Sequence, residues 1–235
     1  MELNLPGKPA TITVLAAGGS DPYRPPDGGN HIMGKKFAIG CLGALVLGAL
    51  IVGMWIVGAY NSLVGLDQQV QKQWAQVENV YQRRADLVPN LVETVKGAAA
   101  FEKDTFTAVT EARSKVSQLS SQAVSDITRN PEAFTKFQQA QDGLSSALSR
   151  LMVVVEKYPD LKATQNFRDL QSQLEGTENR ITVERMRFNE SAQAFNTRRN
   201  RFPTVVIAGF FGDKFRDKVY FKAQAGAETA PKVQF

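Results

Sequence analysis

One apolar stretch constrains this chain more than any other feature of its sequence. Residues 37–59, FAIGCLGALVLGALIVGMWIVGA, contain no charged and no strongly polar side chain. As a helix that rises about 1.5 Å per residue, this stretch is about 35 Å long and can cross the hydrocarbon core of a bilayer with some tilt. A buried helix of a soluble protein is rarely apolar on every face for so long. The sequence therefore predicts a membrane protein with one transmembrane helix over residues 35–59.

Two alternatives compete with an uncleaved anchor. Lys35 and Lys36 precede the apolar run as in a secretory signal peptide, but the run exceeds the usual apolar core of such a signal, and no A-x-A-like cleavage site follows it. Cys41 loosely resembles a lipidation site, but residues 37–40, which separate it from the lysines, are too short for that core. We therefore expect the segment to remain as an anchor.

The predicted span carries a stripe of small residues and has unequal flanks. Gly40, Ala44 and Gly48 recur every fourth position on one helix face. Such a face permits close packing of a second span, so a homo-oligomer stays open, although glycine and alanine are common in spans generally. Two lysines directly precede the apolar run, whereas the first basic residue after it is Lys72. Because cytoplasmic flanks are enriched in basic residues, this small bias predicts that the following domain lies outside the cytoplasm.

Residues 1–32 differ from the rest of the chain in composition. They hold half of the 10 prolines and two Gly-Gly pairs, so they cannot bury a core and are predicted to form a disordered tail. Met33, followed by Gly34 and two lysines, resembles a natural start. A misassigned upstream extension is therefore the alternative interpretation of this segment.

Composition narrows the chemistry of the part after the span. That part has no histidine and no cysteine, because the chain's single residues of each type are His31 and Cys41. This excludes ordinary zinc sites, histidine-based triads, thiol nucleophiles and Glu-x-x-His di-iron sites there. No glycine-rich phosphate loop is present, and a net charge of +5 is too small to indicate nucleic acid as a partner. We expect no catalytic, metal or cofactor site, and an unrecognised carboxylate site is the least favoured hypothesis.

Helical periodicity dominates the rest of the chain. Apolar residues recur every three or four positions from Leu63 to Ala99, which predicts a straight helix that continues from the span without a linker. Pro89 and Gly97 are the two positions at which a break of this helix stays open. Further helices are predicted over residues 101–119 and 131–158, the second beginning at Asn130-Pro131.

The last predicted helix has the clearest pattern. Its apolar seam consists of residues spaced by seven, namely Phe167, Leu174, Ile181, Phe188, Phe195 and Phe202. A seam of this kind packs against other helices. We therefore predict an all-α fold in which residues 60–202 form an antiparallel up-down four-helix bundle of long helices, with a final helix of about 60 Å. Residues 203–235 are predicted to form a capping segment and tail, extended over residues 205–211. Shallow insertion of residues 205–211 into the membrane beside the anchor is the alternative.

Several motifs together resemble one known family. They are RRADLVPNLVETVKG at residues 83–97, LEGTENRITVERMRFNESAQAFNTRRNRFP at residues 174–203, YNSLV at residues 60–64, and YFKAQAGAETAPKVQF at the end of the chain. In order and spacing, residues 37–235 resemble the LemA family. The resemblance implies a single-pass protein of the bacterial inner membrane with a helical bundle, and it implies no reaction. The usual topology of the family places the short N-terminus outside, which conflicts with the lysine bias.

The two longest motifs are polar, and the predicted bundle brings them together. If the last helix runs antiparallel to the first, Arg83 or Arg84 can pair with Glu178, and Asp86 can pair with Arg180. The candidate site consists of Arg83, Arg84, Asp86, Asn90, Glu178, Asn179 and Arg180. Two interpretations stay open for it. It either fixes the register of the helices, as partly buried ion pairs can do, or it binds a partner.

Other polar residues of the last helix invite separate hypotheses. Asn189 and Asn196 are spaced by seven and are expected to bond across the bundle. Arg198, Arg199 and Arg201 are placed near the membrane by the antiparallel arrangement and can contact anionic lipid headgroups, with a solvated face as the alternative. The leading functional hypothesis is a non-catalytic, membrane-anchored scaffold or adaptor for other membrane or envelope proteins. The second is a lipid-binding or membrane-shaping module.

Overall fold

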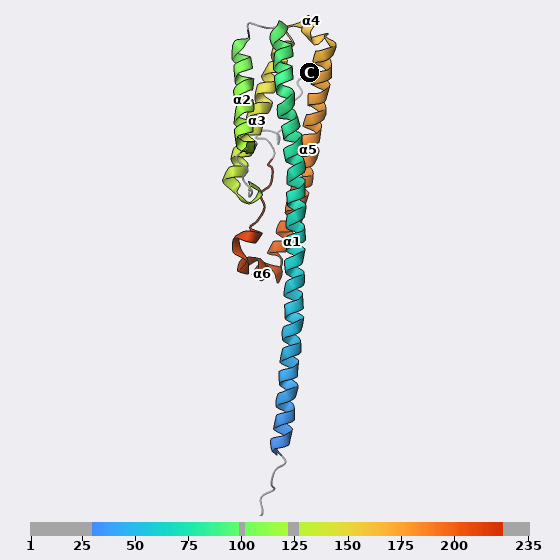
Figure 1. The fold of residues 1–235 in the computed structure, drawn as a ribbon, viewed down its shortest axis with the longest axis vertical. Coiled ribbons are helices and arrows are strands. Elements are labelled where there is room, and N and C mark those ends of the chain that lie inside the picture. The colour runs from blue at the N-terminus through green and yellow to red at the C-terminus, as the bar shows by residue number, and fades with distance from the viewer. Residues whose placement is uncertain (1–29, 99–101, 122–126, 223–235) are drawn as a thin grey trace, which may run out of the picture. The chain divides into compact units, whose positions relative to one another are not determined.

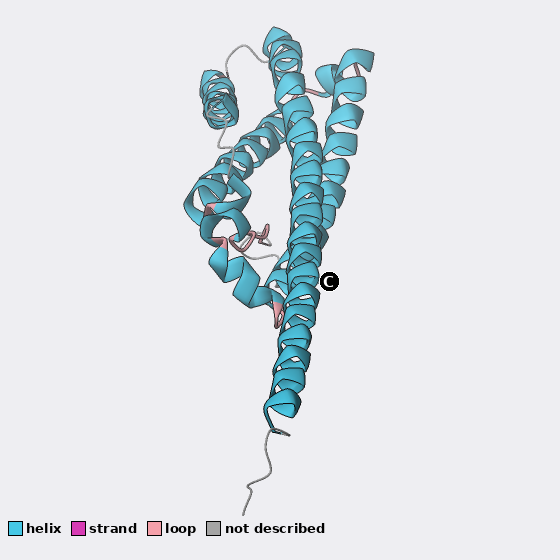
Figure 2. Cartoon of the chain, turned by 60° about the horizontal axis from the view of Figure 1, so that its bottom comes forward, coloured by secondary structure: helices cyan, strands magenta, loops and turns pink. Residues whose placement is uncertain are grey.

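The described part of the chain is helical. The computed structural model describes residues 30–98, 102–121 and 127–222, in which no strand occurs. Its elements, shown in Figures 1 and 2, are α1 (Asn30–Ala98), α2 (Lys103–Ser121), η1 (Ile127–Arg129), α3 (Pro131–Val155), α4 (Pro159–Lys162), α5 (Gln165–Asn200), α6 (Thr204–Phe210) and η2 (Gly212–Phe215). The predicted all-α class is confirmed. The predicted tail lies, up to residue 29, outside the described residues.

The chain divides into two compact units, which are described separately. The first comprises residues 1–52, of which the structure describes the start of α1. The apolar part of α1 is the one candidate membrane span in the described part of the chain, by length and composition. Within this unit Gly40, Ala44 and Gly48 are exposed, and nothing approaches the two glycines. Their role as a packing face stays a prediction.

The second unit comprises residues 53–235, and we call its described part, residues 53–222, the helical domain. Helix α1 enters it without a break at Pro89, which lies inside the helix, and ends one residue after Gly97. An internal proline removes one backbone hydrogen bond. The helix continues because the apolar stripe stays in phase on both sides of the proline, with Val88, Leu91 and Val95 all buried.

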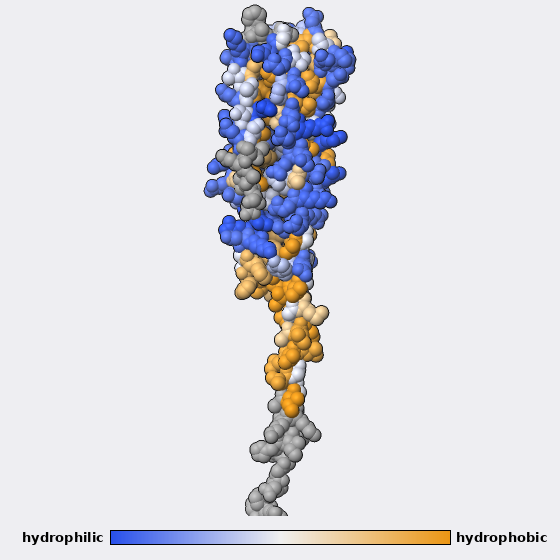
Figure 3. Space-filling view, viewed as in Figure 1, coloured by the Kyte–Doolittle hydropathy of each residue, from blue (hydrophilic) through white to orange (hydrophobic). Residues whose placement is uncertain are grey.

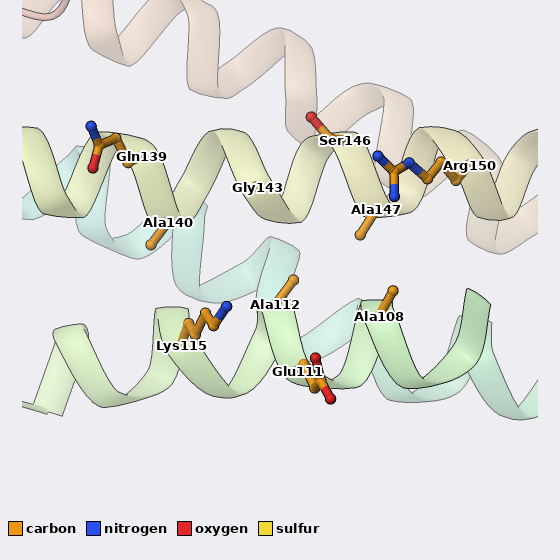
Figure 4. A pocket seen from close by; sticks show the side chains of 10 residues that line it. All are labelled: Ala108, Glu111, Ala112, Lys115, Gln139, Ala140, Gly143, Ser146, Ala147 and Arg150. Carbon is orange, nitrogen blue, oxygen red and sulfur yellow. The ribbon is translucent and has the colours of Figure 1, made fainter. Parts of the chain in front are cut away.

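Side-chain contacts define the directions of the long helices within this domain. Trp74 of α1 packs against Phe134 of α3 and Phe188 of α5, whereas Arg84 of α1 bonds to Ser145 of α3 and Glu178 of α5. Residue numbers therefore rise together in α1 and α3 and run oppositely in α1 and α5. Figure 4 shows that α2 and α3 also run in opposite directions. The four long helices alternate in direction along the chain.

The core of the helical domain has two parts. One joins aliphatic residues of α1, α2, α3 and α5 and includes Val95, Val109, Leu151 and Phe167. The other is aromatic and centres on Trp74, Phe134, Phe137, Phe188 and Phe221. Large aromatic side chains dominate the energy of such a core because each buries a large apolar area. Every residue of the predicted seam from Phe167 to Phe195 is buried.

Three details of the helix bounds differ from the prediction. Helix α5 has 36 residues and ends at Asn200, so Phe202 lies beyond it and is 78% exposed instead of extending the seam. Helix α3 ends at Val155, before the predicted boundary. Residues 204–210 form a helix and not an extended segment. The reason is that Thr204, Ile207 and Ala208 are buried at a spacing of three and four, the period of a helix.

Candidate functional site

A buried arginine lies at the centre of the candidate site. Arg84 of α1 is 1% exposed. Its Nη1 donates to Ser145 Oγ at 2.7 Å and to Glu178 Oε1 at 2.8 Å. Its Nη2 donates to the backbone oxygen of Gln141 at 3.1 Å and also to the side-chain oxygen of Gln141. One guanidinium thus joins three helices, α1, α3 and α5, at a single level.

The electrostatics of this cluster depend on one carboxylate. A buried cation is costly unless it is paired and hydrogen-bonded. Glu178 supplies the charge from a side chain that is 42% exposed, whereas Gln141 and Ser145 supply neutral acceptors from the interior. The Arg84 guanidinium also lies 5.1 Å from the centroid of the Tyr81 ring. Burial raises the pKa of the Tyr81 phenol above its usual value, opposed by the nearby Arg185 and Arg84.

The structure places the predicted site residues in two groups. Arg84 and Glu178 form the ion pair that the antiparallel arrangement led us to expect. The second expected pair is wrong, because Asp86 and Arg180 are both exposed and Asp86 accepts a hydrogen bond from Gln82 at 2.8 Å instead. Two residues along a helix turn the side chain by about 200°. If Arg84 and Glu178 face inward, the residues two positions on must face solvent.

The remaining members of the candidate site are exposed residues of α1 and α5. The strip, as we use the term, consists of Arg83, Asp86, Asn90, Asn179 and Arg180, all of which are exposed. Arg83 and Asn179 directly adjoin the buried pair in sequence, so the strip lies at the level of that pair. The pair of the buried Arg84 and the partly exposed Glu178 therefore fits the register interpretation, while the strip stays available for the partner interpretation.

The structure contains a second polar cluster that the sequence does not predict. Asp67 of α1 pairs with Arg129 of η1 at 2.7 Å and with Lys218, which follows η2. Lys218 is buried, and its ammonium lies 4.9 Å from the centroid of the Phe195 ring. Asp67 thus ties two segments after α2 to the first helix. No motif marks these residues, because the three are far apart in the sequence and none belongs to a recognisable pattern.

The two asparagines of α5 bind the backbone of the segment after η2. Asn196 donates to the Lys218 carbonyl at 2.9 Å and accepts from the Lys218 amide at 2.7 Å. Asn189 does the same with Phe221, at 3.1 Å and 2.9 Å. Seven helical residues rise about 10.5 Å, and three extended residues span about 10 Å, so the two spacings match. The expectation that these amides bond across the bundle is corrected, since their partner is the C-terminal segment.

The three arginines at the end of α5 are not equivalent. Arg199 donates to the Phe215 carbonyl and pairs with Asp217 at 3.1 Å, so it holds the C-terminal segment in place. Arg198 is half-buried, and Arg201 is exposed. Contact with lipid headgroups stays a prediction for this group, and the geometry leaves Arg201 as its most accessible member.

A shallow groove of about 340 Å³ lies between α2 and α3. Figure 4 shows Ala108 and Ala112 of α2 pointing toward α3, and Ala140 and Ala147 of α3 pointing toward α2. The groove exists because these side chains are too small to fill the space between the helices. Among the described residues, no group of three or more histidine, cysteine, aspartate or glutamate side chains is arranged to hold a metal ion.

Comparison with known proteins identifies the family. The model of the LemA family matches residues 73–235, which include the Arg84 cluster and both asparagines, and the chain belongs to this family. The magnetosome protein MamQ of Magnetospirillum gryphiswaldense is 27% identical over 184 residues, covering 72% of this chain and 67% of that protein. Magnetosome protein MamQ 2 of Paramagnetospirillum magneticum is 26% identical over 184 residues, again covering 72% of this chain and 67% of that protein. Protein LemA of Metamycoplasma hominis is 24% identical over 148 residues, 63% of each chain.

These findings agree with the general character of the chain. Neither the family's description nor the names of these relatives denotes an enzyme. The family match begins after the apolar stretch, so that stretch is a separate observation. Family membership and the apolar part of α1 together indicate a membrane-associated protein.

Proposed function

We propose that this chain is a single-pass protein of a bacterial inner membrane whose helical domain is a non-catalytic scaffold for other membrane or envelope proteins. The proposal rests on a difference between residues of the two polar motifs: some hold the helices together, and others are exposed. Arg84 and Glu178 are used to join three helices, whereas all five residues of the strip remain exposed at the same level. Polar residues that the fold does not use are candidates for recognition.

The strip has the chemistry of a polar docking surface. Arg83 and Arg180 provide cations, Asp86 provides an anion, and two asparagines provide both donors and acceptors. Each guanidinium can bind a carboxylate through two hydrogen bonds. Charged groups at the edge of an interface mainly direct association and orientation. We therefore propose a protein partner with acidic and amide side chains on its facing surface.

Photo-crosslinking in intact membranes tests this proposal. A photoreactive amino acid replaces Arg83 or Asn179 in the full chain, and Arg168, which is also an exposed residue of α5 but lies outside the strip, serves as the matched control. We expect discrete crosslinked proteins from the two strip positions and none of the same proteins from position 168. Identical crosslinks from all three positions would contradict a specific surface. Crosslinks only to a second copy of this chain would replace the adaptor by a homo-oligomer.

A further inference from the structure

Helix α6 and Phe202, which lies two residues before it, expose large apolar side chains. Phe202 is 78% exposed, Val206 is 65% exposed, and Phe210 is 86% exposed. Helix α6 has no charged residue on any face, since its sequence is TVVIAGF. One face, with Ile207 and Ala208, packs on the helical domain, and the opposite face is equally apolar. A surface helix without a polar face is stable only where something other than water covers it.

The residues that directly follow α6 contact the end of the predicted span within the same unit. The Phe211 ring lies 4.9 Å and the Phe215 ring 5.5 Å from the ring of Tyr60, which directly follows the apolar stretch. Within the unit, Met54 and Val57 of that stretch are also exposed. On the face shown in Figure 3, apolar surface gathers at the α6 end of the helical domain, and the rest of the domain is largely hydrophilic.

Basic and aromatic residues surround the same region. Lys214 donates to the Tyr60 hydroxyl, and its ammonium lies 4.9 Å from the centroid of the Tyr60 ring. Arg201 and Arg216 are exposed on either side of α6 in the sequence. Lysine and arginine favour anionic headgroups, and aromatic rings favour the boundary between headgroups and acyl chains. The apolar face, the tyrosine and the basic residues are the parts of an interfacial membrane contact.

We propose that α6, together with Phe202, lies in the interface of the bilayer that α1 anchors to, with Phe202, Val206 and Phe210 inserted among the lipids. This inference rests on the proposed anchoring by α1 and adds a second attachment point. The lipid bilayer is the occupant that the structure favours, because the chain itself enters the membrane next to this face. Two attachment points restrict rotation of the helical domain about α1, so they fix which face the domain presents along the membrane.

Depth-dependent fluorescence quenching tests the inference in the full chain. The only cysteine, Cys41, is changed to serine, and Phe210→Cys then carries the fluorophore. Val153→Cys is the matched control, because Val153 is an apolar residue of α3 that is 64% exposed. The protein is reconstituted in vesicles of phosphatidylethanolamine and phosphatidylglycerol. These vesicles contain lipids with a nitroxide near the top of the acyl chain, and iodide is the quencher added to the water.

The expected result is several-fold stronger lipid quenching at position 210 than at position 153, with iodide quenching in the reverse order. A label on the native Cys41 reports the span itself. Lipid quenching at position 41 but not at position 210 overturns the inference and leaves the anchoring intact. Absence of lipid quenching at both positions overturns both. Self-quenching of the position 210 label that disappears when the protein is diluted in lipid assigns α6 to a second copy and also overturns the inference.

The Phe210→Cys change itself is not expected to disturb folding. Phe210 is almost fully exposed, so little packing is lost when it is replaced. Far-UV circular dichroism of each labelled variant in the same vesicles checks this. A second position, Val206→Cys, repeats the measurement on the same face of α6, and both positions must respond alike for the inference to stand.

Discussion

At the scale of the residue, Arg84 shows how one side chain can hold three helices together. Its guanidinium bonds to α3 and α5 from α1, and its single carboxylate partner is Glu178. Buried ion pairs add little net stability relative to apolar packing, but they are costly to break from one side. We infer that this cluster fixes the register of the helices.

Removal of either charge from the buried pair is expected to destabilise the domain. Glu178→Gln leaves Arg84 without a counterion, and Arg84→Met removes four hydrogen bonds, so each change should cost about 1–3 kcal/mol of unfolding free energy. The double variant should lose less than the sum, with a coupling of about 0.5–3 kcal/mol. Urea unfolding of the full chain in detergent measures all four proteins. The matched control is Asp86→Asn with Arg180→Gln, two exposed changes expected to stay within about 0.5 kcal/mol of the parent.

Tyr81 is expected to make the domain sensitive to high pH. Burial raises the pKa of its phenol in the folded state, so the unfolded chain loses this proton at a lower pH than the folded chain. The contribution of Tyr81 to the free energy of unfolding is therefore complete below the pKa of the phenol in the unfolded chain, about 10. It is lost as pH rises through the pKa of the phenol in the folded chain. Thermal melting in steps of pH, compared with Tyr81→Phe, measures this contribution. Equal alkaline destabilisation of the two proteins would refute it.

At the scale of the element, the segment after η2 forms backbone hydrogen bonds with side chains of α5, besides one to Thr128 of η1 and one to Gln138 of α3. Asn189 and Asn196 each bond both the amide and the carbonyl of one residue in this segment. The segment is extended but pairs with no strand among the described residues. The asparagine side chains supply hydrogen bonds of the kind that a neighbouring strand would supply. A helix with asparagines spaced by seven is thus able to hold a strand-like segment, and the C-terminal part is the element most sensitive to their loss.

Loss of one asparagine should release that segment locally. Asn196→Ala leaves the buried amide and carbonyl of Lys218 without these partners, at a cost of about 1–3 kcal/mol for each group. Hydrogen exchange should therefore accelerate at residues 218–222 and remain unchanged in α2 and α3. Asn179→Ala, on the exposed surface of the same helix, is the control. Uniform acceleration throughout the domain would mean that the asparagine supports the whole fold instead.

The sequence predicted some elements better than others, for physical reasons. The sequence predicts the seam from Phe167 to Phe195 because its apolar residues recur every seven positions over many helical turns. The antiparallel arrangement then sufficed to bring Arg83 or Arg84 to the level of Glu178, and the structure selects Arg84. Helix α6 was missed because a short apolar run has no distinguishing period, and packing on the rest of the domain decides its form. The partners of Asp67 were not predictable, since their contacts exist only after the helices and the C-terminal segment have packed.

At the scale of the whole molecule, we propose that the chain combines a membrane anchor, a helical domain and a polar surface for partners. The anchor rests on the apolar part of α1, and the domain belongs to the LemA family. The side of the membrane follows only from the lysines before the apolar stretch. Protease added to spheroplasts is expected to degrade the helical domain. Full protection until the cell membrane is broken would place the domain in the cytoplasm.

The central claim is that recognition and folding use different residues of the same two motifs. The most direct measurement compares Arg83→Glu with Arg180→Glu, combined in one full chain, against the parent protein. Co-purification from solubilised membranes, quantified by mass spectrometry, is read together with the melting temperature. The account predicts an unchanged melting temperature and a loss of the partners that crosslink to position 83. A variant that melts as the parent does and retains all of these partners would contradict it.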